Sequence, residues 1–155
     1  MIKEIHLHDP ELFEQVWNMQ QQAYGIEALL IGFHEIPPLL ETKDELMQVQ
    51  EHFYGWYTDS NELAGVISYE REAPHLVQIC RVMVRPDHFR KGIGRALMQY
   101  VLSMKDVHTF TICTGLKNTP AITLYEQLGF HYVRDDEVAP GVVLRTLSKT
   151  QPLTT

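Results

Sequence analysis

The sequence is poor in cysteine, in long apolar runs and in positive charge, and each shortage excludes a class of protein. It has two cysteines in 155 residues, Cys80 and Cys113, and both lie in apolar, strand-like segments. Two cysteines cannot make a disulfide framework, and we expect both to be buried and reduced. No apolar run approaches the length of a membrane span, and the N-terminal residues MIKEIHLHDP contain no apolar signal core. We therefore expect a cytoplasmic protein without a membrane partner.

The shortage of positive charge argues against nucleic acid as a partner. Thirteen lysines and arginines stand against 20 aspartates and glutamates, which gives a formal net charge of −7. Binding to a nucleic acid backbone requires clustered positive charge. No metal site is expected either, because the histidines are scattered and no cysteine pair has zinc spacing. The sequence also lacks the P-loop, zinc-protease and nucleophile-elbow patterns.

Hydrophobic periodicity predicts a mixed α/β (α+β) domain over residues 1–150, with a frayed tail over 151–155. The predicted element order is β-α-α-β-β-β-α-β-α-β-β. Strands are expected at 2–7, 52–58, 62–69, 77–84, 107–113, 130–133 and 142–147. Helices are expected over 10–24 or beyond, from 42, over 92–105 and over 119–129, and residues 30–38 are interpreted as irregular. The strand-helix-strand unit over 77–113 implies a parallel strand pair. We therefore expect a central mixed sheet of about seven strands, with helices on both faces.

A basic glycine turn joins the fourth predicted strand to the third predicted helix. Arg90 and Lys91 precede Gly92-Ile93-Gly94, and Arg95 follows. Free N–H groups and the helix dipole attract anions to a helix N-terminus, and glycine lets a ligand approach the backbone closely. Basic residues are unfavourable at a helix start, so three of them together indicate a bound anion. We interpret the turn as a pyrophosphate site; the alternative is a structural turn with solvated basic side chains.

Two segments resemble the acetyl-CoA-binding regions of the GNAT family of N-acetyltransferases. In VMVRPDHFRKGIGRAL the spacing of Pro86, Gly92 and Gly94 matches the family pattern, whereas Phe89 occupies the position of its Arg or Gln. Residues 118–130, NTPAITLYEQLGF, resemble the family's other characteristic segment. The resemblance implies the GNAT fold, with its fourth and fifth strands splayed apart, and acetyl-CoA as co-substrate.

The same resemblance implies roles for particular residues. It makes Tyr125 the catalytic residue, whose hydroxyl donates a proton to the departing thiolate; the alternative is a plain core position, because Tyr125 continues an apolar helical stripe. A backbone N–H of Val82 or Met83 would serve as oxyanion donor. Asn118 would bind the pantetheine, or else act only as a turn residue. The implied cofactor-binding residues are Val82, Met83, Val84, Phe89, Arg90, Lys91, Gly92, Ile93, Gly94, Arg95 and Asn118.

The general base and the acceptor are not identified by the sequence. Residues 33–38, with Trp56 and Tyr57, are expected to bind the acceptor, and Glu35 is the candidate carboxylate there; the alternative is an ordinary loop near a core. Glu70, Glu72, His75 and His34 are further positions considered for a base, and the interpretation favoured for each is a solvated surface residue. Two functions stay open. One is acetyl transfer from acetyl-CoA to a primary amine of a small molecule or peptide by direct attack in a ternary complex. The other is a non-catalytic acetyl-CoA-binding sensor or partner subunit, and a homodimer is expected by analogy with the family.

Overall fold

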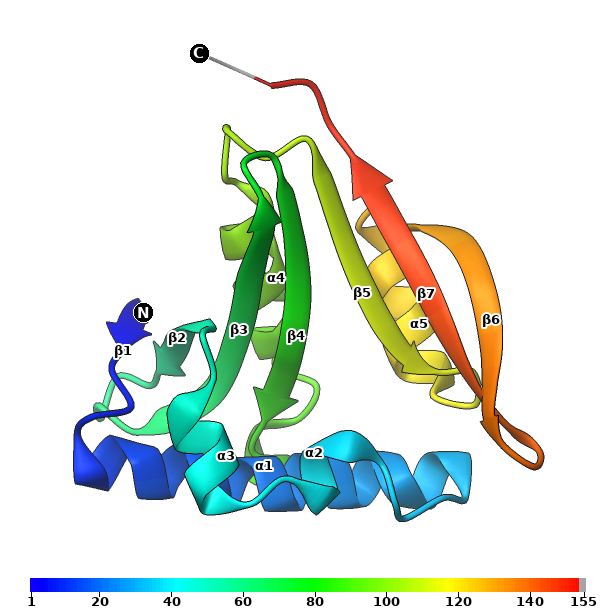
Figure 1. Ribbon diagram of the computed structural model, residues 1–155. Coiled ribbons are helices and arrows are strands. Elements are labelled where there is room, and N and C mark those ends of the chain that lie inside the picture. The colour runs from blue at the N-terminus through cyan, green and yellow to red at the C-terminus, as the bar shows by residue number, and fades with distance from the viewer. Residues whose placement is uncertain (154–155) are drawn as a thin grey trace.

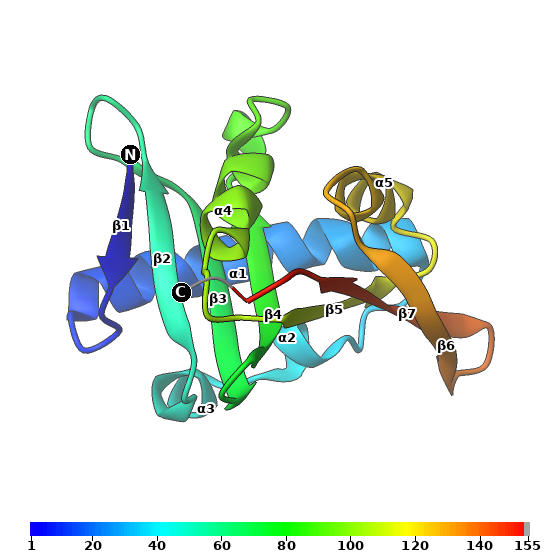
Figure 2. The same cartoon turned by 90° about the horizontal axis from the view of Figure 1, so that it is seen from above.

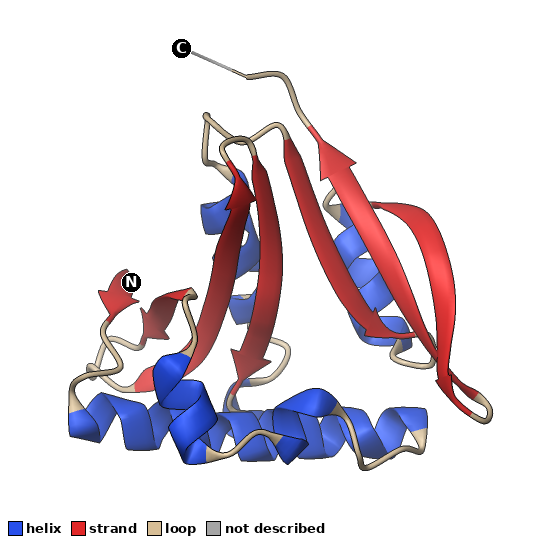
Figure 3. Cartoon of the chain, viewed as in Figure 1, coloured by secondary structure: helices blue, strands red, loops and turns tan. Residues whose placement is uncertain are grey.

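The computed structural model describes residues 1–153 and contains one seven-stranded mixed sheet in the order β1-β2-β3-β4-β5-β7-β6 (Figures 1 and 3). The strands are β1 (Ile2–Ile5), β2 (His52–Tyr57), β3 (Leu63–Ala73), β4 (Leu76–Val84), β5 (Thr109–Gly115), β6 (His131–Ala139) and β7 (Val142–Thr150). The helices are α1 (Pro10–Ile31), α2 (Pro37–Leu40), α3 (Lys43–Gln48), α4 (Ile93–Leu102) and α5 (Thr119–Gln127), and a 3₁₀ turn spans Pro86–His88. The predicted fold class is confirmed.

The sheet is split down its middle, between β4 and β5. These two strands are parallel and pair only from Leu76↔Thr109 to Gln78↔Thr111. Beyond this point they diverge toward their C-terminal ends, as Figure 1 shows. On the inner edge of β4, the backbone N–H of Val82 donates to the hydroxyl of Tyr24 at 3.3 Å instead of to β5. The predicted splay of the fourth and fifth strands is therefore present.

Helices cover both faces of the sheet (Figure 2). On one face, α4 and α5 pack on β3, β4 and β5 through an apolar cluster centred on Ile67, Leu97 and Phe110. On the other face, α1 and α3 pack on β2, β3 and β4 through a second cluster that includes Val16, Leu46 and Met83. Helix α1 crosses the C-terminal edge of the split (Figure 1). It therefore closes the bottom of the gap between β4 and β5.

The structure differs from the sequence expectations mainly at element ends. Helix α1 continues to Ile31 and stops at Gly32, which has a φ of 71°. Its last turns are held by a small cluster in which Ala28, Ile31 and Ile36 are buried. The stretch 30–38, interpreted as irregular, ends in the first two residues of the short helix α2 (Pro37–Leu40). Strand β6 extends to Ala139, because pairing with β7 overrides the exposed, charged run in its middle.

The helix starts follow ordinary capping chemistry. The carboxylate of Asp9 accepts from two backbone N–H groups at the start of α1, and Thr42 and Glu45 form the expected capping box of α3. Helix α5 is capped by Asn118, one residue before the expected Thr119, because the Asn118 side chain accepts from the N–H of Ala121.

The C-terminal end of β7 is fastened to the neighbouring loop. The side-chain amide of Gln151 donates to the carbonyls of Met104 and Val107, and its backbone N–H donates to His108. The tail predicted to be frayed, residues 151–155, thus begins with a residue that donates three hydrogen bonds, and its residues 154–155 lie outside the described residues. No helix within residues 1–153 is both long and apolar enough to cross a membrane.

Candidate active-site cleft

The gap between β4 and β5 is a cleft of about 590 Å³. Its walls come from the two diverging strands, and the end of α1 and the beginnings of α4 and α5 close it. Most of the site residues expected from the sequence line this cleft, namely Val82, Val84, Phe89, Arg90, Gly92, Ile93, Gly94, Arg95, Asn118 and Tyr125. The expected site residues, which lie up to about forty positions apart in the sequence, thus come together in one cleft.

Two of the expected residues lie outside the cleft. Met83 is buried in the cluster under α1, on the opposite face of β4. Strand alternation turns its N–H toward β3, as it does for Arg85, whose N–H donates to Ala64. The side chain of Lys91 turns toward the Nδ1 of His88, at 3.3 Å. Of the two candidate oxyanion donors, only the N–H of Val82 therefore faces the gap.

The N-terminus of α4 has the chemistry of an anion site. Its N-cap is Gly92, with a φ of 76°, and no side chain caps the free N–H groups of the first turn. Arg90 also has a positive φ, of 65°, which is uncommon outside glycine and clusters at ligand sites. Arg90 and Arg95 line the cleft around this helix start. An acetyl-CoA pyrophosphate fits these groups, because they offer backbone donors and positive charge without a competing carboxylate cap.

Two tyrosine side chains, the buried Tyr125 and the half-buried Tyr24, line the cleft. Tyr125 on α5 is 7% exposed and packs against Phe130. Burial raises the pKa of the Tyr125 hydroxyl above its usual value, and the negative charge of Glu27 raises it further. The pKa of Tyr24 is raised by the same two causes in the same order. Both side chains therefore stay protonated at neutral pH and can donate a proton.

A carboxylate that the sequence reasoning missed completes this part of the cleft. Glu27 on α1 accepts hydrogen bonds through Oε1 from the Thr114 hydroxyl at 2.9 Å and from the Asn118 side-chain amide at 3.2 Å. The sequence contains one signal that could have identified Glu27. It is the only charged residue in a stripe with i, i+3, i+4, i+7 spacing on one helix face, formed by Ala23, Ile26, Glu27 and Leu30. This stripe lines the cleft.

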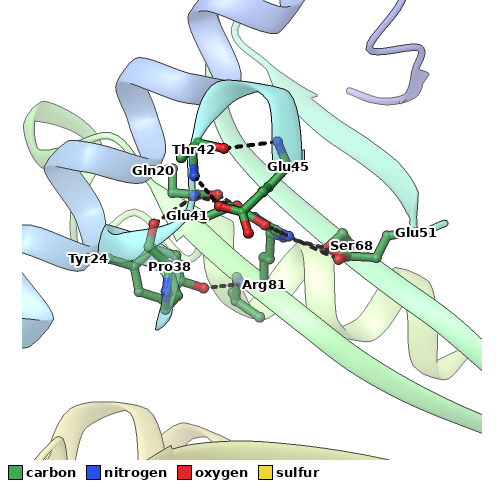
Figure 4. A network of polar contacts seen from close by, with 10 residues as sticks. Gln20, Tyr24, Pro38, Glu41, Thr42, Glu45, Glu51, Ser68 and Arg81 are labelled. Carbon is green, nitrogen blue, oxygen red and sulfur yellow. Dashed lines mark hydrogen bonds and ion pairs between the residues drawn. The ribbon is translucent and has the colours of Figure 1, made fainter. Parts of the chain in front are cut away.

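Arg81, the charged residue on the two strands that line the cleft, has a structural role. Its five N–H donors reach the carboxylates of Glu41 and Glu51 and the side-chain oxygen of Gln20 (Figure 4). Burial acts to raise the pKa of Glu41, but the hydrogen bonds from Arg81 and Gln20 outweigh it, so that pKa lies below its usual value. Glu51 also accepts from Ser68 at 2.6 Å. This buried network fastens the segment of α2 and α3 to β4.

The residues expected to bind the acceptor do not line the cleft. His34 and Glu35 are exposed, and Phe33 packs against the small cluster at the end of α1. Trp56 and Tyr57 pack into the two apolar clusters of the sheet instead. Helix α1, which was expected to reach Tyr24 or beyond, continues to Ile31, and its last two turns line the cleft instead of the loop that follows. Of the other candidate bases, Glu70 and Glu72 are exposed on β3 and His75 in the turn after it.

The cysteines also differ from expectation. Both are free, but Cys80 is only half-buried and Cys113 is exposed. They lie on β4 and β5, and both line the cleft. The expected burial is wrong for Cys113 because the strands diverge before they reach it. Within residues 1–153, no group of three or more His, Cys, Asp and Glu side chains is placed to hold a metal ion.

Comparison with known proteins places this geometry in a family. The sequence profile of the acetyltransferase (GNAT) family matches residues 13–130. The UPF0157 protein YqkA of Bacillus subtilis (strain 168) is 39% identical over 145 residues, which are 93% of this chain and 42% of that protein. This chain thus spans less than half of that relative. The N-acetyltransferase 9-like protein of Nematostella vectensis is 25% identical over 153 residues, 90% of this chain and 73% of that protein.

Solved structures show the same fold. The ribosomal-protein-S18-alanine N-acetyltransferase of Escherichia coli superposes with a TM-score of 0.76 and 19% identity, covering 97% of this chain and 92% of that one. The spermidine N-acetyltransferase of Vibrio cholerae, solved with CoA and spermine, gives a TM-score of 0.72 and 15% identity over 97% of this chain and 95% of that one. At these identities the likeness establishes the fold.

Proposed function

Because the chain belongs to the acetyltransferase (GNAT) family, we propose that it transfers an acetyl group from acetyl-CoA to a primary amine in the cleft between β4 and β5. Acetyl-CoA would supply the acetyl group as an activated thioester. The observation that carries this proposal is the uncapped start of α4, where free backbone N–H groups, Arg90 and Arg95 border the cleft. These groups would hold the pyrophosphate by charge and by backbone hydrogen bonds.

The inner end of the cleft supports transfer as well as binding. The N–H of Val82 faces the gap and donates only to the Tyr24 hydroxyl at 3.3 Å, a long bond that a ligand carbonyl can replace. Tyr125 is the proposed proton donor to the leaving thiolate, because its hydroxyl is buried, protonated and within the same cleft. A binding module without turnover would not need such a donor.

Titration calorimetry with CoA tests the cofactor site. Arg90 and Lys91 are neighbours with the same charge, but only Arg90 lines the cleft. We expect Arg90→Gln to weaken CoA binding by about tenfold, the loss of one charge-assisted contact, whereas Lys91→Gln changes it little. Equal effects of the two substitutions would mean that general charge, and not this site, attracts the ligand. An absence of binding to the wild-type protein would end the proposal.

Turnover is tested separately, by following CoA release from acetyl-CoA in the presence of a panel of primary amines. We expect release with at least one amine. Tight acetyl-CoA binding without release under any acceptor would favour the non-catalytic sensor or partner subunit. The acceptor's identity, the homodimer and the cytoplasmic location stay predictions. Sedimentation velocity at increasing protein concentration tests the homodimer.

A further inference from the structure

The cleft has an acidic end as well as a basic one. Among the described residues that line it, Glu27 is the only carboxylate, and it lies on α1 beside Asn118, the N-cap of α5. Arg90 and Arg95 lie at the α4 end. Arg81 does not neutralise Glu27, because Glu41, Glu51 and Gln20 take its donors. A ligand that fills the cleft thus meets positive charge at one end and a single negative charge at the other.

Glu27 is held in a fixed orientation. Its Oε1 accepts from the buried Thr114 hydroxyl and from Asn118, which is itself fixed as the N-cap of α5. Within residues 1–153 no hydrogen bond reaches Oε2. One oxygen therefore positions the carboxylate, and the other keeps its capacity to accept a hydrogen bond from a ligand.

Glu27 also lies close to the proposed proton donor. Tyr24 lies one turn before Glu27 on α1, Tyr125 lies on α5, whose N-cap Asn118 donates to Glu27, and all three side chains line the cleft. A nitrogen bound at Glu27 would therefore lie near the point where the thioester is to be cleaved. None of the exposed carboxylates that the sequence suggested has such neighbours.

The surroundings of Glu27 are apolar on its own helix. Ala23, Ile26 and Leu30 share its helix face and line the cleft, and Leu30 is 48% exposed. A ligand cation at Glu27 would thus have its carbon skeleton against aliphatic side chains. A compound with several charges along its length would leave charge against this apolar surface, at a desolvation cost.

We propose that Glu27 binds the ammonium group of the acceptor, and that the acceptor is a primary amine carried on an apolar body. This inference rests on the proposed function, and it names the acceptor class for the same cleft. Glu27 acts as a binding residue, before the nitrogen loses its proton to solvent and attacks the acetyl carbon. Asn118 and Thr114 act through Glu27 as positioning residues.

Calorimetry on the CoA-loaded protein tests the proposal with 2-phenylethylammonium and its uncharged counterpart, 2-phenylethanol. We expect the wild-type protein to bind the ammonium compound at least about tenfold more tightly than the alcohol, a difference of about 1.4 kcal/mol. Glu27→Gln should remove this preference without changing the affinity for the alcohol. The amide oxygen can still accept from Thr114 and Asn118, so the variant should keep the fold. Glu35→Gln, on the exposed loop that follows α1, is the matched control and should bind like the wild type.

Each other outcome contradicts the proposal. If Glu27→Gln keeps the preference, or if 2-phenylethylammonium does not bind, Glu27 is not the ammonium site. Tighter binding of putrescine, which has two charges and no apolar body, would overturn the acceptor class. In turnover, Glu27→Gln should raise KM for the amine more than it lowers kcat, a split that general misfolding would not produce.

The CoA titration separates this inference from the proposed function. Normal CoA binding by both the wild type and Glu27→Gln, with unchanged amine binding in the variant, would overturn only the role of Glu27. Failure of the wild type to bind CoA would overturn both.

Discussion

At the scale of the residue, burial decides the chemistry of the cleft. Tyr125 could be placed from the sequence because it lies in a motif, but its periodicity did not distinguish a core position from a functional one. In the structure Tyr125 is 7% exposed and also lines the cleft, so the same side chain belongs to the core and to the candidate site. Glu27 could not be assigned, because nothing local in the sequence shows that α1 passes below β5. Its partners Thr114 and Asn118 are 87 and 91 residues away along the chain.

Replacing Tyr125 by phenylalanine tests its role as proton donor. We expect kcat to fall by about 100-fold, a usual loss for a general acid, while the affinity for CoA stays the same because the ring is retained. Steady-state kinetics together with CoA calorimetry measure the two effects. Thr123→Ala on the exposed side of α5 is the control. Wild-type kcat in Tyr125→Phe would show that the thiolate leaves without this proton.

The raised pKa values of two tyrosines also predict how stability changes in alkali. The pKa of Tyr24 and of Tyr125 lies above the usual 10.0 in the folded protein. The unfolded chain therefore loses these protons first, and their stabilising contribution, complete below pH 10, is lost as the pH rises above it. Thermal melts from pH 8 to pH 11.5 should show a steep fall in Tm above pH 10. Tyr125→Phe should make that fall shallower, and an unchanged slope would mean that other groups cause it.

At the scale of the element, the network around Arg81 holds the segment of α2 and α3 against β4. Arg81→Met removes the cation and leaves Glu41 and Glu51 as largely buried carboxylates without an opposite charge. We expect a loss of about 3–5 kcal/mol in the free energy of unfolding, measured by urea denaturation at pH 7. Arg134→Met, at an exposed ion pair with Asp136, should cost less than about 1 kcal/mol. If both variants lose a similar free energy of unfolding, the network around Arg81 stabilises the fold no more than an exposed ion pair does.

The same network predicts how the stability of the fold changes as the pH falls. The pKa of Glu41 is lowered on folding, so its contribution is present above the usual value of 4.5 and is lost as the pH falls below it. Urea denaturation between pH 7 and pH 3.5 should show this loss in the wild type. The loss should be smaller in Arg81→Met, because the partner that lowers the pKa is absent. An identical acid dependence in the two proteins would contradict the assignment.

A substitution at Gly94, at the start of α4, should weaken CoA binding without lowering the stability of the fold. A Cβ at Gly94 would lie 3.8 Å from Val84 and 3.9 Å from Leu124, which are ordinary contacts. Gly94→Ala should thus fold and keep or raise stability by about 0.5 kcal/mol, while its methyl group weakens CoA binding by about tenfold through lost close approach. Gly25→Ala, where a Cβ meets nothing within 4 Å, should leave CoA binding unchanged. Calorimetry and thermal melts measure both, and unchanged CoA affinity in Gly94→Ala would place the ligand elsewhere.

At the scale of the whole molecule, the sequence predicted the order and class of nearly every element, because alternation, caps and glycines are local signals. It predicted the splayed strands only through a family resemblance. It left the end of α1 open beyond Tyr24, because that end depends on the packing of Ala28 and Ile31 against a later segment. The acceptor was therefore expected at the loop of residues 33–38, whereas in the structure α1 and not this loop lines the cleft.

The reaction rates of the two cysteine thiols in the cleft can report whether CoA enters the gap between β4 and β5. Cys80 and Cys113 line the cleft from β4 and β5, and burial raises the pKa of Cys80 to about 12. At pH 8 we expect iodoacetamide to modify the exposed Cys113 faster, since little thiolate forms at Cys80. Saturating CoA should slow both reactions, as peptide mass spectrometry would show. Modification rates that do not respond to CoA would mean that the ligand does not enter the split.

Helix α1 precedes in the sequence all the residues proposed to bind the acetyl donor. On the proposed function, recognition of the acetyl donor would depend on residues after position 80, and the surface offered to the acceptor would come from a helical stripe before position 31. Substitutions at Ala23, Ile26, Glu27 and Leu30 would then change which amines are accepted without disturbing the donor half. New acceptor preferences could arise in evolution, or by design, within two turns of a single helix.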